Sequence, residues 1–259
     1  MKSWYKIEAK AESSTVYIYD EIGLWGITAK DFISELDALK TGKITLRINS
    51  PGGDVFDGFA IFNAIKDHPA QVNTQVDGLA ASIASIIAMA GDEITIASNA
   101  FFMVHNAWAF SLGNADDMRK MADTLDKIDT TIVKTYTERT GQTQRDIRQM
   151  MSDETWLNAD EAVGLGFADR IMSGSGAKAA FDLSQFRNAP KDLHQESQHT
   201  ARDIEKALRD AGISKKAALA TVSTIKRDVR SDTEHDLDIV KQFIAKMAAF
   251  TTTNKPRGV

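Results

Sequence analysis

The sequence predicts an α/β fold in which a largely parallel sheet is covered by helices. Strand-like and helix-like segments alternate up to about residue 172, which is the order of a βαβ architecture. The 259 residues are 43% hydrophobic and 26% charged, a composition typical of globular proteins. That length is sufficient for one sizeable core and an appendage.

The first four elements alternate between strand and helix. Residues 14–22 (STVYIYDEI) alternate β-branched or aromatic positions with others, which is the pattern of a half-buried strand. The helix predicted over 27–40 begins with a capping box at Thr28. Residues 44–50 (ITLRINS) form the next predicted strand. Apolar residues at helical spacing then predict a helix over 54–69, which a proline ends.

The alternation continues through the following elements. A short strand is predicted over 71–78, a helix of small apolar residues over 80–91, and strands over 93–98 and 101–106. A long amphipathic helix is predicted from 114 to 141, where a glycine ends it. Its apolar stripe consists of Met118, Met121, Leu125, Ile128, Ile132 and Tyr136. This stripe either packs on its own domain or contacts another molecule.

The chain divides near residue 172 into parts of opposite charge. Residues 1–172 hold 16 Lys and Arg against 25 Asp and Glu, whereas residues 173–259 hold 15 against 11. Small and polar residues after the division are typical of linkers. We therefore expect a first domain over 1–172, a flexible linker over 173–200 and a small α-helical appendage over 201–259. The basic residues of the appendage are interpreted as a solvated face rather than a nucleic-acid site.

Composition excludes several classes of function. Because cysteine is absent, disulfides, thiolate catalysis and cysteine-ligated metals are excluded, and five scattered histidines do not suggest a metal site. No apolar run is long enough to span a bilayer, and the N-terminus lacks the apolar centre of a secretory signal, so a cytoplasmic location is expected. No nucleotide-binding motif is present and no cofactor is expected, so any ATPase is predicted to be a separate chain.

Three short motifs contain candidate catalytic residues. Ser82 lies in GLAASIAS, where a predicted strand turns into an apolar helix and a serine can be exposed at the sheet edge. Gly53, in INSPGG, lacks a Cβ and can present its N–H to an oxyanion. His105 ends the apolar strand FFMVHN. Each motif has a structural alternative: close helix packing, an ordinary turn, or a core histidine.

Taken together and in this order, the three motifs resemble the proteolytic subunit of the Clp protease and its ClpP-like relatives. The resemblance spans about residues 14–172 and continues in ETWLNADEAVGLGFADRI, residues 154–171. It implies a ClpP/crotonase-like core of repeated β-β-α units with a projecting handle helix. The crotonase-type acyl-CoA enzymes share this fold, but they do not need a serine and histidine pair.

The same resemblance implies a serine endopeptidase and a role for each candidate residue. Ser82 would be the nucleophile and His105 the general base, while the N–H groups of Gly53 and Ile83 would form the oxyanion hole. The family's orienting aspartate falls on Glu154, with Asp153 as the alternative third member. A serine–lysine dyad is disfavoured because no lysine occurs between residues 66 and 120.

The resemblance also implies a polypeptide substrate and a homo-oligomeric ring in which handle helices meet. An extended substrate would lie between the strand that follows the glycines and the segment after the histidine. The substrate-binding residues expected on this basis are Gly52, Asp54, Val55, Asn106 and Ala107.

Relatives with an added tail and a similar ending resemble the head-maturation proteases of tailed bacteriophages. That resemblance implies cleavage of scaffold and capsid proteins, in the host cytoplasm or inside the procapsid. The alternatives are a degradative subunit that depends on an ATPase and a catalytically silent assembly protein.

Overall fold

The computed structural model describes residues 7–9, 13–24, 26–172, 181, 183 and 186–190. The helical appendage predicted over 201–259 lies outside the described residues, as does most of the linker predicted over 173–200. Both therefore stay predictions, together with the domain boundary between them.

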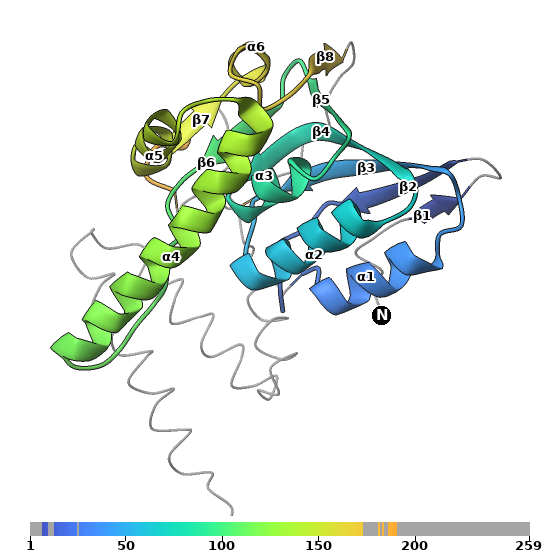
Figure 1. The fold of residues 1–259 in the computed structure, drawn as a ribbon. Coiled ribbons are helices and arrows are strands. Elements are labelled where there is room, and N and C mark those ends of the chain that lie inside the picture. The colour runs from blue at the N-terminus through green and yellow to red at the C-terminus, as the bar shows by residue number, and fades with distance from the viewer. Residues whose placement is uncertain are drawn as a thin grey trace, which may run out of the picture. The chain divides into compact units, whose positions relative to one another are not determined.

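The described chain contains eight strands and six helices that alternate in sequence (Figure 1). The strands are β1 (Ile7–Ala9), β2 (Ser13–Ile18), β3 (Lys43–Ser50), β4 (Gln71–Ala81), β5 (Glu93–Ala97), β6 (Phe101–Val104), β7 (Thr155–Leu157) and β8 (Arg170–Met172). The helices are α1 (Ala29–Ala38), α2 (Val55–Asp67), α3 (Ile83–Ala88), α4 (Ala115–Thr140), α5 (Gln144–Ser152) and α6 (Ala159–Gly164).

All eight strands belong to one largely parallel sheet. Its main path runs β1-β2-β3-β4-β5-β8, and β6 pairs with the end of β4. Only the pairs β1–β2 and β6–β7 are antiparallel among the strands described. Parallel neighbours joined by helices explain the alternating sequence pattern, and the predicted α/β fold class is confirmed.

Capping residues set the ends of the main helices as the sequence predicts. Thr28 caps α1 and accepts a hydrogen bond from the backbone N–H of Asp31 at 3.2 Å. The long helix α4 begins after Asn114, which forms a capping box, and ends at Gly141 in the left-handed conformation. Figure 1 shows the first turns of α4, in green, extending away from the sheet.

Several local predictions differ from the structure. The helix predicted from residue 80 begins only at Ile83, because β4 continues through Ala81 and pairs with β6. The strand predicted over 101–106 ends at Val104, which leaves His105 just beyond the sheet. Helix α5 and strands β1 and β7 were not predicted.

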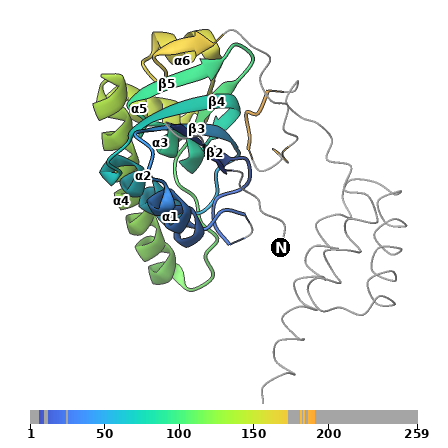
Figure 2. The same ribbon diagram turned by 90° about the vertical axis from the view of Figure 1, so that its right-hand side faces the viewer.

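The core lies on both faces of the central strands. Alternate residues of a strand point to opposite faces, and Ala80 belongs to the main core under the helices, whereas Leu79 and Ala81 belong to a second apolar cluster. Leu183 and Phe186 are buried in that second cluster. Figure 2 shows α1 and α2 on one side of the sheet and the short orange segment near residue 190 on the other. These residues of the predicted linker therefore pack on the first domain.

Helices α1 to α6 contain no span that is both long and apolar enough to cross a membrane.

Candidate functional site

Ser82 occupies a strained turn between β4 and α3. Its backbone has φ 54° and ψ −129°, a combination that L-residues rarely adopt, and its side chain makes no capping hydrogen bond. Its backbone N–H instead donates to the carbonyl of Met103 at 2.9 Å, which ties the turn to β6. The hydroxyl is therefore directed away from the helix it precedes.

His105 is the partner of that hydroxyl. Parallel pairing of β4 with β6 places Ala81 beside Met103, so the chain segments that follow the two strands lie close together. The Nε2 atom of His105 lies 2.7 Å from the Oγ of Ser82. In the tautomer with its proton on Nδ1, the imidazole accepts the hydroxyl hydrogen and can act as its base.

The glycine loop before α2 lies against the same turn. A Cβ on Gly52 would be 2.7 Å from both the carbonyl oxygen of Ala81 and the Cβ of Ser82, so only glycine permits this approach. Within the described part of the chain, the N–H groups of Gly53 and Ile83 donate to no protein acceptor. The predicted oxyanion-hole residues thus flank the serine with unpaired donors.

The two candidate third members lie in different surroundings. Glu154 is 4% exposed and follows α5 with a left-handed φ of 50°. In the antiparallel β6–β7 ladder Val104 pairs with Thr155, so His105 and Glu154 are the residues that follow and precede the last pair of the ladder. Asp153 is exposed, and its carboxylate accepts hydrogen bonds from the side-chain amide of Gln149 at 2.9 Å.

The carboxylate of Glu154 is bound by the backbone of a distant segment. Its Oε2 accepts the N–H of Arg187 at 3.0 Å, and its Oε1 accepts the N–H of Asn188 at 2.6 Å. Because a buried carboxylate is costly without hydrogen-bond donors, these two N–H groups compensate the burial of Glu154. The sequence analysis missed them, because nothing in residues 186–188 marks them as partners of a site more than thirty residues away.

Burial and the charge of Glu154 act in opposite directions on the pKa of His105. Burial lowers the pKa of the imidazole, because the low-dielectric surroundings disfavour the charged ring. The negative charge of Glu154 raises that pKa, and the positive charge of Arg187 lowers it further. The net direction is downward, so the ring is neutral and able to accept a proton over most of the physiological range.

An elongated apolar cavity opens beside the serine and histidine. It runs from the Ser82 turn along α4, and its walls include five residues of the predicted apolar stripe: Met121, Leu125, Ile128, Ile132 and Tyr136. Tyr136 lines the cavity and is buried, whereas Met118 does not line it and is 38% exposed. The stripe therefore has two roles, since its inner end packs in the core and its middle lines the cavity.

The predicted substrate-binding residues lie at the cavity only in part. Asp54, Val55 and Ala107 line it, as does the predicted oxyanion-hole residue Gly53, whereas Gly52 and Asn106 do not. The expectation of a strand after the glycines was wrong. Asp54 is the N-cap of α2 and Val55 is its first residue, because the Asp54 carboxylate binds the free N–H groups of the first turn.

The segment after the histidine is held by the protein itself. The N–H of Asn106 donates to the carbonyl of Met151 at 3.2 Å, and the N–H of Ala107 donates to the carboxylate of Asp129 at 2.7 Å. Asp129 lies on α4 and was not predicted as part of the site. It fixes the backbone of this wall of the cavity.

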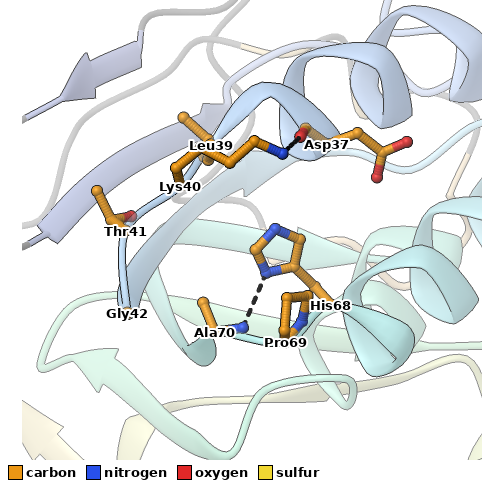
Figure 3. A pocket seen from close by; sticks show the side chains of 8 residues that line it. All are labelled: Asp37, Leu39, Lys40, Thr41, Gly42, His68, Pro69 and Ala70. Carbon is orange, nitrogen blue, oxygen red and sulfur yellow. Dashed lines mark hydrogen bonds between the residues drawn. The ribbon is translucent and has the colours of Figure 1, made fainter.

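A second surface hollow lies between α1 and the turn before β4 and holds another histidine. Figure 3 shows His68 and Pro69 facing Leu39, Lys40 and Thr41 there. The Nδ1 of His68 accepts the backbone N–H of Ala70 at 3.1 Å. His68 thus supports a turn.

Comparison with known proteins gives one consistent result. The family model described as Clp protease matches residues 2–175. The chain is 35% identical over 133 residues to the "ATP-dependent Clp protease proteolytic subunit 1" of Chlamydia abortus, covering 50% of this chain and 69% of that protein. It is 33% identical over 145 residues to the "ATP-dependent Clp protease proteolytic subunit" of Streptococcus pneumoniae, covering 54% and 74% respectively.

Proposed function

Because the chain belongs to the Clp protease family, we propose that it is a serine endopeptidase whose nucleophile is Ser82 and whose general base is His105. The observation that carries this proposal is the 2.7 Å contact between the serine Oγ and the histidine Nε2 at a strained turn. A packing serine needs neither the strained backbone nor the imidazole partner.

The proposed reaction proceeds through an acyl-enzyme. Nε2 of His105 takes the hydroxyl proton while the Oγ of Ser82 forms a bond to the substrate carbonyl carbon. The resulting oxyanion lies toward the N–H groups of Gly53 and Ile83. When the C–N bond breaks, the imidazolium gives its proton to the leaving amine. Water then repeats the sequence and releases the acid.

Glu154 is proposed as the third member, in preference to Asp153. Its buried carboxylate belongs to the residue just before the one that pairs with Val104, and it interacts electrostatically with the imidazole. A buried negative charge at this place stabilises the imidazolium that forms during proton transfer. The exposed Asp153 carboxylate is already paired with Gln149.

The cavity along α4 supports a polypeptide substrate with an apolar side chain next to the cleaved bond. Leu125, Ile128 and Ile132 offer it an apolar wall. The cavity also begins at Ser82, so a side chain inserted there would hold its own carbonyl near the nucleophile.

The test of the proposed function is labelling of the full chain with a fluorophosphonate, followed by intact mass. We expect one adduct on the wild-type protein and none on Ser82→Ala. The matched control is Ser85→Ala, which removes a buried serine of the same motif whose hydroxyl contacts Tyr136 and the backbone carbonyl of Ser82 but no histidine. An unlabelled wild-type protein that is folded would favour the catalytically silent assembly protein.

The assembly is proposed to be a homo-oligomeric ring. Both relatives named above are proteolytic subunits of ATP-dependent proteases, which supports a separate ATPase partner for this chain too. The exposed first half of α4 supports a contact between copies, since Met118 and the preceding Phe110 and Leu112 are apolar and exposed. Sedimentation of the purified chain, with and without a Clp ATPase, tests this proposal.

Cleavage of scaffold and capsid proteins during phage head maturation is the narrower proposal. It is supported by the resemblance of the ending ETWLNADEAVGLGFADRI and by the chain that continues beyond the matched residues 2–175. A maturation protease should cut a scaffold protein at a few sites without ATP. A degradative subunit should instead need an ATPase and produce short peptides, which mass spectrometry of the products distinguishes.

A further inference from the structure

Three consecutive residues beyond the matched family region contact the candidate catalytic group. We call Phe186, Arg187 and Asn188 the carboxylate clamp. The backbone N–H groups of its last two residues bind one oxygen each of Glu154, at 3.0 and 2.6 Å. The side-chain amide of Asn188 also donates to the carbonyl of Asp153 at 2.7 Å. The clamp therefore binds both the Glu154 carboxylate and the peptide carbonyl that precedes Glu154.

Apolar packing fixes the clamp to the sheet. Phe186 is buried, and its ring meets the ring of His105 edge-on at 5.6 Å between centroids and that of Trp156 at 5.8 Å. Leu183 is buried in the same cluster against β4 and β6. The N–H groups of residues 187 and 188 are thus positioned by an anchor that itself contacts the imidazole.

The geometry favours a supporting role over a blocking one. With the clamp in place, the Ser82–His105 contact is still 2.7 Å, so the nucleophile and base remain paired. A carboxylate has about four lone-pair positions, so two backbone donors leave capacity for an imidazole N–H. Without the clamp, the buried Glu154 carboxylate would lose two backbone donors. These hydrogen bonds compensate the desolvation of the carboxylate.

We propose that Phe186, Arg187 and Asn188 are positioning residues of the peptidase, and that the backbone N–H groups of Arg187 and Asn188 hold the Glu154 carboxylate oriented beside His105. This inference rests on the proposed function of Ser82 and His105. It makes part of the predicted linker a component of the active site. Removing a clamp N–H should weaken the charge that supports the imidazolium while leaving the substrate cavity walls on α4 unchanged.

The test compares, at one position, a proline variant that lacks the backbone N–H with an alanine variant that keeps it. Asn188→Pro eliminates the donor to Oε1, whereas Asn188→Ala loses the side-chain amide but keeps the N–H. A second pair, Arg187→Pro and Arg187→Ala, tests the donor to Oε2 in the same way. Both variants lack the guanidinium, so they differ in the backbone N–H. This pair is used if Asn188→Pro does not fold. Each full-length variant is titrated by NMR at the His105 ring and labelled with fluorophosphonate.

The expected result is a difference within each pair. The proline variant should have a lower His105 pKa than its alanine partner and should be labelled roughly ten-fold more slowly. Equal pKa values and equal rates would overturn the proposal. A higher pKa with faster labelling would also overturn it, because the clamp would then be holding Glu154 away from the imidazole. If even the wild-type protein is not labelled, the proposed function fails, while the His105 titration still decides the clamp.

Discussion

The Oγ of Ser82 lies 2.7 Å from the Nε2 of His105, although 23 positions separate the two residues. The contact follows from the sheet, since the last residues of β4 pair in parallel with β6 and both chains then leave the sheet at the same edge. The hydrogen bond from the backbone N–H of Ser82 to the carbonyl of Met103 fixes the two segments to each other. The contact has the geometry that the proposed proton transfer from serine to histidine requires.

The labelling rate should fall off at a more acidic pH than it would if His105 had the pKa of an ordinary histidine. Burial lowers the pKa of His105 from 6.5, so the neutral, proton-accepting ring persists at more acidic pH. Fluorophosphonate labelling should rise with pH to a plateau, with its midpoint below 6.5. A midpoint above that value would mean that the charge of Glu154 outweighs burial. The measurement is the labelling rate of the wild-type chain across the acidic and neutral range.

The identity of the third member follows from two amide substitutions. Glu154→Gln removes the negative charge that raises the pKa of His105, so that pKa should fall and labelling should slow by roughly ten-fold or more. Asp153→Asn changes an exposed group paired with Gln149 and should alter the labelling rate by less than about two-fold, as expected for a surface site. The reverse order of effects would assign the role to Asp153.

The glycine loop should be intolerant of a side chain at one position. Gly52→Ala places a Cβ 2.7 Å from the Ala81 carbonyl at a φ of +95°, so the Ser82 turn must shift. We expect a loss of about 1–3 kcal/mol in the free energy of unfolding together with loss of labelling. Gly42→Ala is the control, because nothing lies within 4 Å of its added Cβ. Its effect should stay within about 0.5 kcal/mol in urea denaturation.

Local signals made most of the fold predictable. Thr28 and Asn114 cap helices where the sequence places them, and Gly141 ends α4 in the left-handed conformation that glycine favours. The boundary between β4 and α3 was not predictable. Ala80 and Ala81 suit a helix, and pairing with β6 on one side and of Ala80 with Ser50 of β3 on the other keeps them in the sheet.

The sequence could suggest that Ser82 and His105 lie together, but it could not suggest the donors that bind Glu154. The turn at Ser82 and the strand before His105 each have a local pattern. The donors to Glu154 come instead from backbone N–H groups of residues 187 and 188, which every non-proline residue possesses. Backbone donors have no sequence signature, so the contact depends on tertiary packing alone.

Asp129, which binds the backbone of the cavity wall at Ala107, should make the free energy of unfolding depend on pH. Burial is the largest influence on its carboxyl and raises the pKa above 3.8, while the N–H of Ala107 opposes that shift. Because the folded-state pKa is raised, the unfolded chain releases this proton first. The contribution of Asp129 to stability is therefore greatest below pH 3.8 and declines as pH rises through the folded-state value.

Substituting Asp129 by asparagine should remove that decline. The amide introduced by Asp129→Asn keeps an oxygen that can accept the Ala107 N–H, which donates at 2.7 Å in the wild type, but it carries no charge to desolvate. The variant should be at least as stable as wild type at neutral pH, with the difference shrinking toward acidic pH in urea denaturation. Asp123→Asn, an exposed position on the same helix, should show little difference at either pH. A variant that loses stability mainly at neutral pH would mean that the charged bond to Ala107 outweighs the cost of burial.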